Sequence, residues 1–166
     1  MIEIERKFLL KSIPDTEPVD KIKITQYYYK NTEGIWERAR EMDSKLKGKK
    51  YVHTVKTRIS DMSNDEQEKE LTKDEFFSFR RRCIKYPGSS KMLKKTRHIY
   101  IDGDLKWEVD LFSESNTLVI AEVEIQSEDY DLQIPDFITK KMLLEVTTMK
   151  QFGNRNLANK IFKNYT

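Results

Sequence analysis

The chain begins Met1-Ile2-Glu3-Ile4-Glu5-Arg6-Lys7-Phe8, and within this stretch Glu3, Glu5 and Lys7 occupy every second position. Because successive side chains of a β-strand point to opposite faces, two carboxylates and an ammonium group would share one face. Carboxylates about 7 Å apart repel each other by about 2 kcal/mol at an effective dielectric of roughly 20. A divalent cation would remove that repulsion, and the lysine could meet a phosphate. The stretch therefore predicts a strand with a charged face suited to a metal ion.

The same spacing recurs along the chain. Period-two apolar spacing predicts strands over residues 2–10, 21–29, 35–41, 50–59, 66–71, 93–102, 105–112 and 117–127. Their charged groups two positions apart are Glu3/Glu5/Lys7, Arg38/Arg40, Lys56/Arg58, Glu68/Glu70, Lys95/Arg97, Glu108/Asp110 and Glu122/Glu124. Most groups have a single sign, whereas a solvated strand face usually mixes signs. Eight largely antiparallel strands with few helices predict a mainly β (α+β) fold, a closed eight-stranded barrel.

The faces opposite the charges leave two arrangements open. Around Glu108 and Asp110 they carry Trp107, Val109 and Leu111, so this strand has one apolar and one charged face. In one arrangement the apolar faces form the barrel core and the charges point to water. In the other, the charges line a wet interior and helices cover the apolar outer faces.

The chemistry of the charged groups favours the second arrangement. Acidic clusters bind hard divalent cations such as Mg²⁺, and arginine forks match phosphate oxygens. A metal bound there would polarise a terminal phosphate and help to activate a water, while the cations would neutralise charge that develops in the transition state. The combination predicts a site for a metal-bound polyphosphate inside the barrel.

Size and composition limit the other classes of protein. A chain of 166 residues without an evident linker predicts one domain over residues 1–166. Its 31 Lys+Arg and 28 Asp+Glu leave a net charge of +3, so we expect no nucleic-acid partner. Cys83 is the only cysteine, which excludes an intrachain disulfide. The sequence has no apolar run of about 20 residues and no signal-peptide core, and we therefore expect a cytoplasmic protein without membrane association.

Three helices are expected. Thr72-Lys73-Asp74-Glu75 forms a capping box and predicts a helix to about residue 84. Pro135 suits the first turn of a short helix that runs to about residue 141. A C-terminal helix could begin at Asn154 or Asn156 and include Leu157, Ala158, Ile161 and Phe162.

The motifs together resemble a known family. Glu-Ile-Glu-Arg-Lys (3–7) is similar to the ExExK motif of the CYTH superfamily, the triphosphate tunnel metalloenzymes. Further stretches follow in the family's order: Gln26-Tyr27-Tyr28, W-E-R-A-R (36–40), T-V-K-T-R (54–58), E-K-E (68–70), K-K-T-R (94–97), W-E-V-D (107–110) and A-E-V-E (121–124). The resemblance spans nearly the whole chain and is closest to the bacterial inorganic triphosphatase (tripolyphosphatase) branch. It implies an eight-stranded tunnel that binds triphosphate inside.

The resemblance also implies roles for individual residues. The metal ligands would be Glu3, Glu5, Asp110, Glu122 and Glu124, with Mg²⁺ or Mn²⁺ as the cofactor. The phosphate contacts would be Lys7, Arg38, Arg40, Lys56, Lys95 and Arg97, with Lys150 as a further basic residue. Arg58 departs from the usual pattern of the family, although we also expect it to bind substrate. Glu68, Glu70 and Glu108 would support these groups, and catalysis would fall to Glu5, Lys7, Arg40, Lys95 and Arg97.

The expected function is divalent-metal-dependent hydrolysis of a linear triphosphate, with inorganic tripolyphosphate as the leading substrate. A class IV adenylyl cyclase and a thiamine triphosphatase are alternatives on the same scaffold. A polyphosphate- or nucleotide-binding module without turnover is an alternative from another class. The expected partner is a small-molecule triphosphate, and an exposed apolar strip could support a homodimer.

Overall fold

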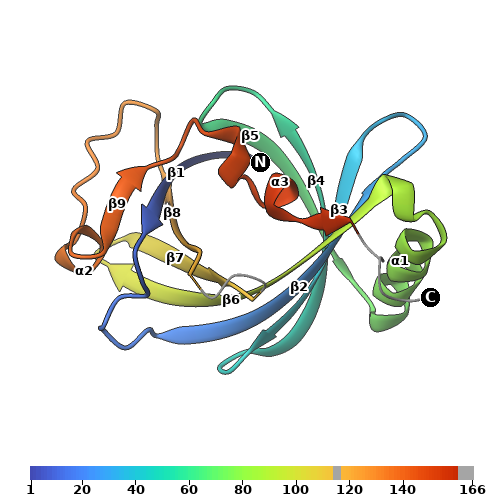
Figure 1. Ribbon diagram of the computed structural model, residues 1–166, viewed down its shortest axis with the longest axis horizontal. Coiled ribbons are helices and arrows are strands. Elements are labelled where there is room, and N and C mark those ends of the chain that lie inside the picture. The colour runs from blue at the N-terminus through green and yellow to red at the C-terminus, as the bar shows by residue number, and fades with distance from the viewer. Residues whose placement is uncertain (114–116, 161–166) are drawn as a thin grey trace.

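Eight antiparallel strands close into a barrel in the computed structural model, which describes residues 1–113 and 117–160 (Figure 1). Around the ring, β1 is followed by β5, β4, β3, β2, β6, β7 and β8, and β8 pairs with β1 again. The strands are β1 (Ile2–Leu10), β2 (Asp20–Lys30), β3 (Trp36–Ser44), β4 (Gly48–Arg58), β5 (Ser63–Leu71), β6 (Ser90–Asp102), β7 (Leu105–Phe112) and β8 (Val119–Ile125). The predicted closed eight-stranded fold is confirmed.

Two short strands and three α-helices complete the described chain. β9 (Met142–Glu145) pairs with β1, and β10 (Asn159–Lys160) pairs with β6. The helices are α1 (Lys73–Lys85), α2 (Asp136–Thr139) and α3 (Asn154–Leu157), with 3-10 turns η1 (Pro87–Ser89) and η2 (Lys150–Phe152). The described part of the chain contains no helix with the length and apolar character needed to cross a membrane.

The capping box of α1 forms as predicted. The Thr72 hydroxyl accepts from the Glu75 amide at 3.2 Å, and the Glu75 carboxylate accepts from the Thr72 amide at 2.7 Å. The predicted C-terminal helix is wrong in its extent, because α3 ends at Leu157 and the chain turns extended at Ala158. The two last members of that prediction, Ile161 and Phe162, lie outside the described residues.

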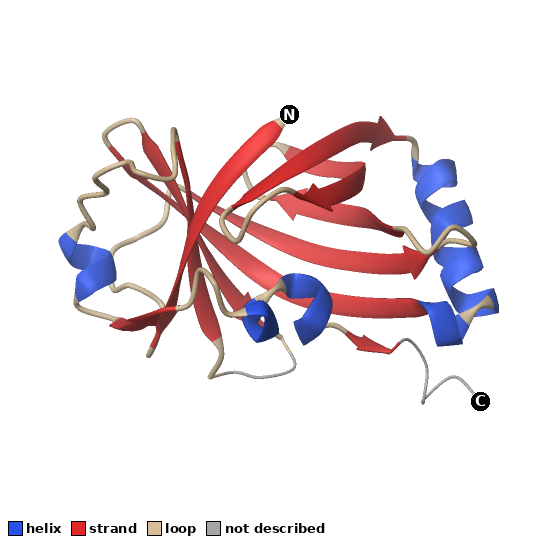
Figure 2. Cartoon of the chain, turned by 90° about the horizontal axis from the view of Figure 1, so that it is seen from above, coloured by secondary structure: helices blue, strands red, loops and turns tan. Residues whose placement is uncertain are grey.

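The barrel is inside-out relative to an ordinary β-sheet core. α1 packs on the outer face of the sheet, over a cluster that includes Tyr27, Phe76 and Phe79. A second cluster, around Trp107 and Val123, is covered by segments that include Leu132 and Ile138 from the region of α2. Figure 2 shows α1 and α2 at opposite ends of the molecule. The apolar strand faces thus point outward and are covered, as predicted by the arrangement in which the charges line the barrel interior.

The wall of the barrel divides beside β1. Residues Ile2–Ile4 pair with β5, whereas Phe8, Leu9 and Leu10 pair with β9 on the same edge of the strand. Between these two partners no strand of the described chain pairs with this edge of β1. The Glu5 amide donates to the Met62 carbonyl at 3.0 Å, and Lys7 donates its amide to the Thr147 hydroxyl at 3.0 Å and accepts at its carbonyl from the Val146 amide at 2.8 Å. An opening in the strand wall therefore lies beside Glu5 and Lys7.

Trp107→Ala should lower the free energy of unfolding by about 3–5 kcal/mol, because it removes a large, fully buried ring. Trp107 is 0% exposed and packs against Phe8 with 5.7 Å between ring centroids. Urea unfolding measures the change, with Ile101→Ala as a control since Ile101 is 54% exposed. A loss below about 1 kcal/mol would contradict the outer core described above.

Candidate active site

A charged cavity of about 570 Å³ occupies the barrel interior. It collects most of the residues that the sequence singled out: Glu3, Glu5, Lys7, Arg38, Arg40, Lys56, Glu68, Lys95, Arg97, Glu108, Glu122 and Glu124 line it. Carboxylates and cations from every strand of the ring except β2 therefore meet in one chamber.

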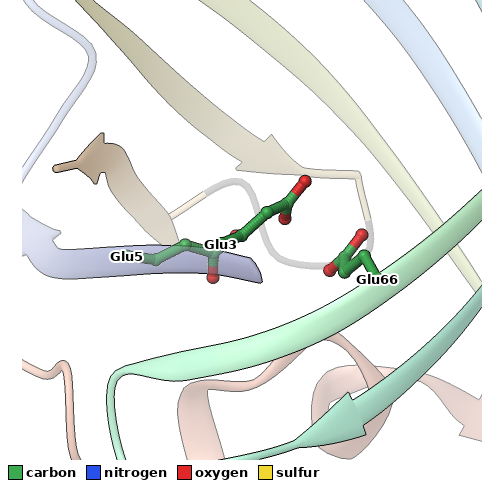
Figure 3. A group of neighbouring side chains, drawn as sticks. All are labelled: Glu3, Glu5 and Glu66. Atoms are coloured by element: carbon green, nitrogen blue, oxygen red, sulfur yellow. The ribbon is translucent and has the colours of Figure 1, made fainter. Parts of the chain in front are cut away.

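Three carboxylates converge at one place in this chamber. Glu3 and Glu5 extend from β1 and Glu66 extends from β5, and each offers an oxygen within 4.8 Å of the others (Figure 3). Burial, followed by the negative charges of Glu66 and Glu5, raises the pKa of Glu3 to about 7. Without a bound cation, burial and mutual repulsion therefore disfavour the state in which all three carboxylates are ionised. A divalent cation would relieve this repulsion.

Lysines hold the carboxylates from both sides. The Lys7 ammonium lies 2.6 Å from Glu122 and 3.1 Å from Glu5. The Lys56 ammonium lies 2.5 Å from Glu66 and 3.6 Å from Glu5. Burial opposes ionisation of Glu66, but Arg38 and Lys56 keep its pKa below the ordinary value.

Asp110 anchors two cations on the opposite wall. It is 1% exposed and accepts from the Lys95 ammonium at 2.5 Å and from two nitrogens of Arg97 at 2.8 Å each. Arg97 also pairs with Glu108 and lies 3.3 Å from Glu122. Burial and the charge of Arg97 lower the pKa of Lys95 to about 8 despite its pairing with Asp110.

Arg38 and Arg40 face the chamber with donors to spare. Arg38 lies 3.4 Å from Glu66, and Arg40 pairs with Glu68. The Nε atoms of both arginines are buried and have no hydrogen-bond partner among the described residues. Guanidinium groups that line a chamber favour an anionic ligand there.

Four predicted residues are absent from the lining of the main chamber. Asp110 is buried behind Lys95 and Arg97, to which it is hydrogen-bonded, and the other three are Glu70, Arg58 and Lys150. Glu70 is exposed near the end of β5 and is not among the residues that line the chamber. Arg58 pairs with Asp61 and lines a smaller cavity of about 250 Å³, together with Lys150. This second cavity lies at the opening beside Glu5 and Lys7, which line both cavities. Arg58 and Lys150 thus lie at an entrance to the chamber rather than along its centre.

Two residues of the site escaped the sequence analysis. Glu66 has the same spacing from Glu68 as Glu68 has from Glu70, so the E-Q-E-K-E run (66–70) contained the signal for it. Asn154 lines both cavities and lies 3.3 Å from the Lys95 ammonium. The sequence marks Asn154 only as a possible start of a helix, which offers no comparable signal for a place in the site.

Known proteins are similar to this chain in sequence and in fold. No model of a known protein family matches the chain. The inorganic triphosphatase of Acetivibrio thermocellus is 26% identical over 164 residues, which are 98% of this chain and 97% of that protein. The crystal structure of the inorganic triphosphatase NE1496 superposes with a TM-score of 0.60 at 28% identity, covering 93% of this chain and 96% of that one.

A more distant structure shares the fold. HpAC1 from Hippeastrum, studied as an adenylyl cyclase and described as having a dominant triphosphatase activity, superposes with a TM-score of 0.51 at 15% identity. That match covers 75% of this chain and 80% of HpAC1. The sequence match over nearly the full length of the chain and the shared closed barrel agree with the resemblance to the CYTH superfamily that the motifs indicate.

Proposed function

We propose that the protein hydrolyses a linear triphosphate, with inorganic tripolyphosphate as the leading substrate, in a reaction that depends on a divalent cation. The observation that carries the proposal is the placement of three converging carboxylates and two arginines with unpaired buried donors in one chamber. The sequence match to the inorganic triphosphatase of Acetivibrio thermocellus supports the same activity.

The residues present fit a divalent cation. Glu3, Glu5 and Glu66 supply the oxygen ligands that Mg²⁺ and Mn²⁺ prefer, and Glu124 lies opposite Glu5 in the strand register. A cation bound there would polarise the terminal phosphate and help to activate a water. Asp110 and Glu122 were also predicted as ligands, but in this structure their oxygens accept from lysine and arginine side chains. We therefore assign the cation to the Glu3, Glu5 and Glu66 cluster.

The cations around the chamber would bind the phosphates and stabilise the transition state. Arg38 and Arg40 approach from one wall, and Lys95 and Arg97 approach from another. Charge spreads over the phosphate oxygens as the terminal phosphoryl group is transferred, so fixed guanidinium groups stabilise that state more than the ground state. Asp110 and Glu122 hold Lys95, Arg97 and Lys7 in place for this task.

Cation binding should weaken as the pH falls below about 7. The pKa of Glu3 is raised to about 7, so below that pH a proton competes with the cation for this carboxylate. Affinity for Mn²⁺ should fall by up to about 10-fold per pH unit between pH 7 and pH 5 and change little above pH 8. Calorimetric titration at pH 6, 7 and 8 measures it, and Glu3→Gln should flatten the dependence. Equal affinity at pH 6 and pH 8 in the unaltered protein would contradict this assignment.

A substrate panel separates the proposed activity from its alternatives. The protein is incubated with tripolyphosphate, ATP or thiamine triphosphate, each with Mg²⁺ or Mn²⁺, and released phosphate is measured. We expect the fastest release from tripolyphosphate. Cyclic AMP formed from ATP would favour the cyclase, and binding of all three without release would favour a binding module. A cytoplasmic location, a homodimer, a lack of nucleic-acid and membrane binding, and a single domain over residues 1–166 stay predictions.

A further inference from the structure

Asn154 reaches the active site from outside the barrel. Of the described residues that line both cavities, the other four (Glu5, Lys7, Arg38 and Lys56) belong to barrel strands, whereas Asn154 begins α3. The C-terminal segment crosses the opening beside β1 on its way from β9 to β6, along the red end of the chain in Figure 1. It therefore adds a side chain to a junction that is otherwise lined by residues of the barrel strands.

Side-chain contacts to backbone carbonyls, one from β6 and one within the segment, hold this segment in position. The Lys91 ammonium donates to the Arg155 carbonyl at 3.2 Å, and the Asn156 amide side chain donates to the Lys150 carbonyl at 2.5 Å. Beyond α3, β10 pairs with β6. Asn154 is thus held between two anchored parts of the chain.

The contact with Lys95 fixes the orientation of the Asn154 carboxamide. A lysine ammonium group can only donate, so the atom that lies 3.3 Å from Lys95 Nζ is the carboxamide oxygen. The Nδ2 group, with its two protons, then points away from Lys95 on the other arm of the carboxamide. Since Asn154 lines both cavities, that donor is available to a ligand at their junction.

We propose that Asn154 is a substrate contact, whose Nδ2 donates to a phosphate oxygen held beside Lys95 while its oxygen holds the Lys95 ammonium. The inference rests on the proposed triphosphate hydrolysis. The nearby cations are engaged by carboxylates: Lys7 pairs with Glu122, and Lys95 pairs with Asp110. A neutral amide donor can bind a phosphate oxygen without competing for those carboxylates. It therefore adds a phosphate contact and leaves the ion pairs intact.

Two substitutions separate the donor from the acceptor of this side chain. Asn154→Ala removes both, whereas Asn154→Asp keeps the shape and the acceptor for Lys95 but places a negative charge where the donor was. We expect kcat/KM for tripolyphosphate to fall about 10- to 100-fold for Asn154→Ala and further for Asn154→Asp. Metal-free tripolyphosphate affinity, measured by calorimetry, should fall in the same order. Gln151→Ala is the matched control, because Gln151 is an exposed amide of the same segment outside both cavities.

The outcomes are distinct. Full activity and affinity in Asn154→Asp, with a loss only in Asn154→Ala, would overturn the substrate contact, since holding Lys95 would then suffice. Unchanged values in both variants would also overturn it. Equal losses in Gln151→Ala would overturn it by showing that the segment acts only through its fold, which thermal unfolding checks independently. Absence of turnover in the unaltered protein would instead reject the proposed function, and the affinity series would still test the contact.

Discussion

Glu5→Gln should lower metal-dependent phosphate release by about 100-fold or more, because it removes a carboxylate from the centre of the proposed cation site. Glu5 offers an oxygen within 4.8 Å of Glu3 and Glu66. Glutamine has the same shape but binds a hard cation weakly, so Mn²⁺ affinity should fall together with the rate. Steady-state phosphate release and Mn²⁺ calorimetry measure the two effects.

The barrel should survive this substitution. Loss of the Glu5 charge relieves part of the repulsion that raises the pKa of Glu3, so the pKa of Glu3 should move back toward its ordinary value. Thermal unfolding tests the fold, and Glu33→Gln is a suitable control because Glu33 is exposed in the turn between β2 and β3. Retention of normal turnover in Glu5→Gln would place the cation elsewhere.

Arg40→Ala should reduce kcat by about 100- to 1000-fold, the range seen when one preorganised electrostatic donor is lost from an active site. Burial and the charge of Arg38 lower the pKa of Arg40 to about 10, which means that the guanidinium remains charged at neutral pH but is incompletely compensated. Its buried Nε has no hydrogen-bond partner among the described residues. An anion in the chamber would supply the missing negative charge.

Arg40→Lys tests how much of the effect needs the guanidinium fork. It keeps a positive charge but cannot offer two parallel donors, so we expect an intermediate rate. Arg81→Ala on the exposed face of α1 is the control for loss of a surface arginine. A rate for Arg40→Ala within about 2-fold of the unaltered protein would exclude Arg40 from transition-state stabilisation.

Local signals in the sequence were sufficient to predict the barrel. Period-two spacing located all eight ring strands, and the Thr72–Glu75 capping box located the start of α1. Periodicity alone could not predict which face of each strand points into the barrel, and the chemistry of the charged groups was needed for that. Trp107 alternates with Glu108 in either arrangement, and only a ligand that needs many charges makes a charged interior favourable.

The details that the sequence could not supply depend on tertiary placement. Which carboxylates converge depends on strand register: β1 pairs with β5 such that Ile2 lies opposite Asp65. This pairing brings the next residue, Glu66, to the N-terminal carboxylates, whereas Glu70 lies near the other end of β5. Asn154 meets Lys95, a residue 59 positions away in sequence, only because its segment crosses the opening in the barrel wall. The periodicity of a sequence cannot predict a contact of that kind.

Direct observation of the reaction by ³¹P nuclear magnetic resonance tests the central claim, that the charged chamber hydrolyses a metal-bound triphosphate. Tripolyphosphate is followed with the unaltered protein in the presence of Mg²⁺ and again with excess chelator. We predict that orthophosphate and pyrophosphate appear in equal amounts with Mg²⁺ and that the chelator abolishes their formation. Intact tripolyphosphate in the presence of Mg²⁺ or Mn²⁺, or equal hydrolysis with the chelator, would contradict the account.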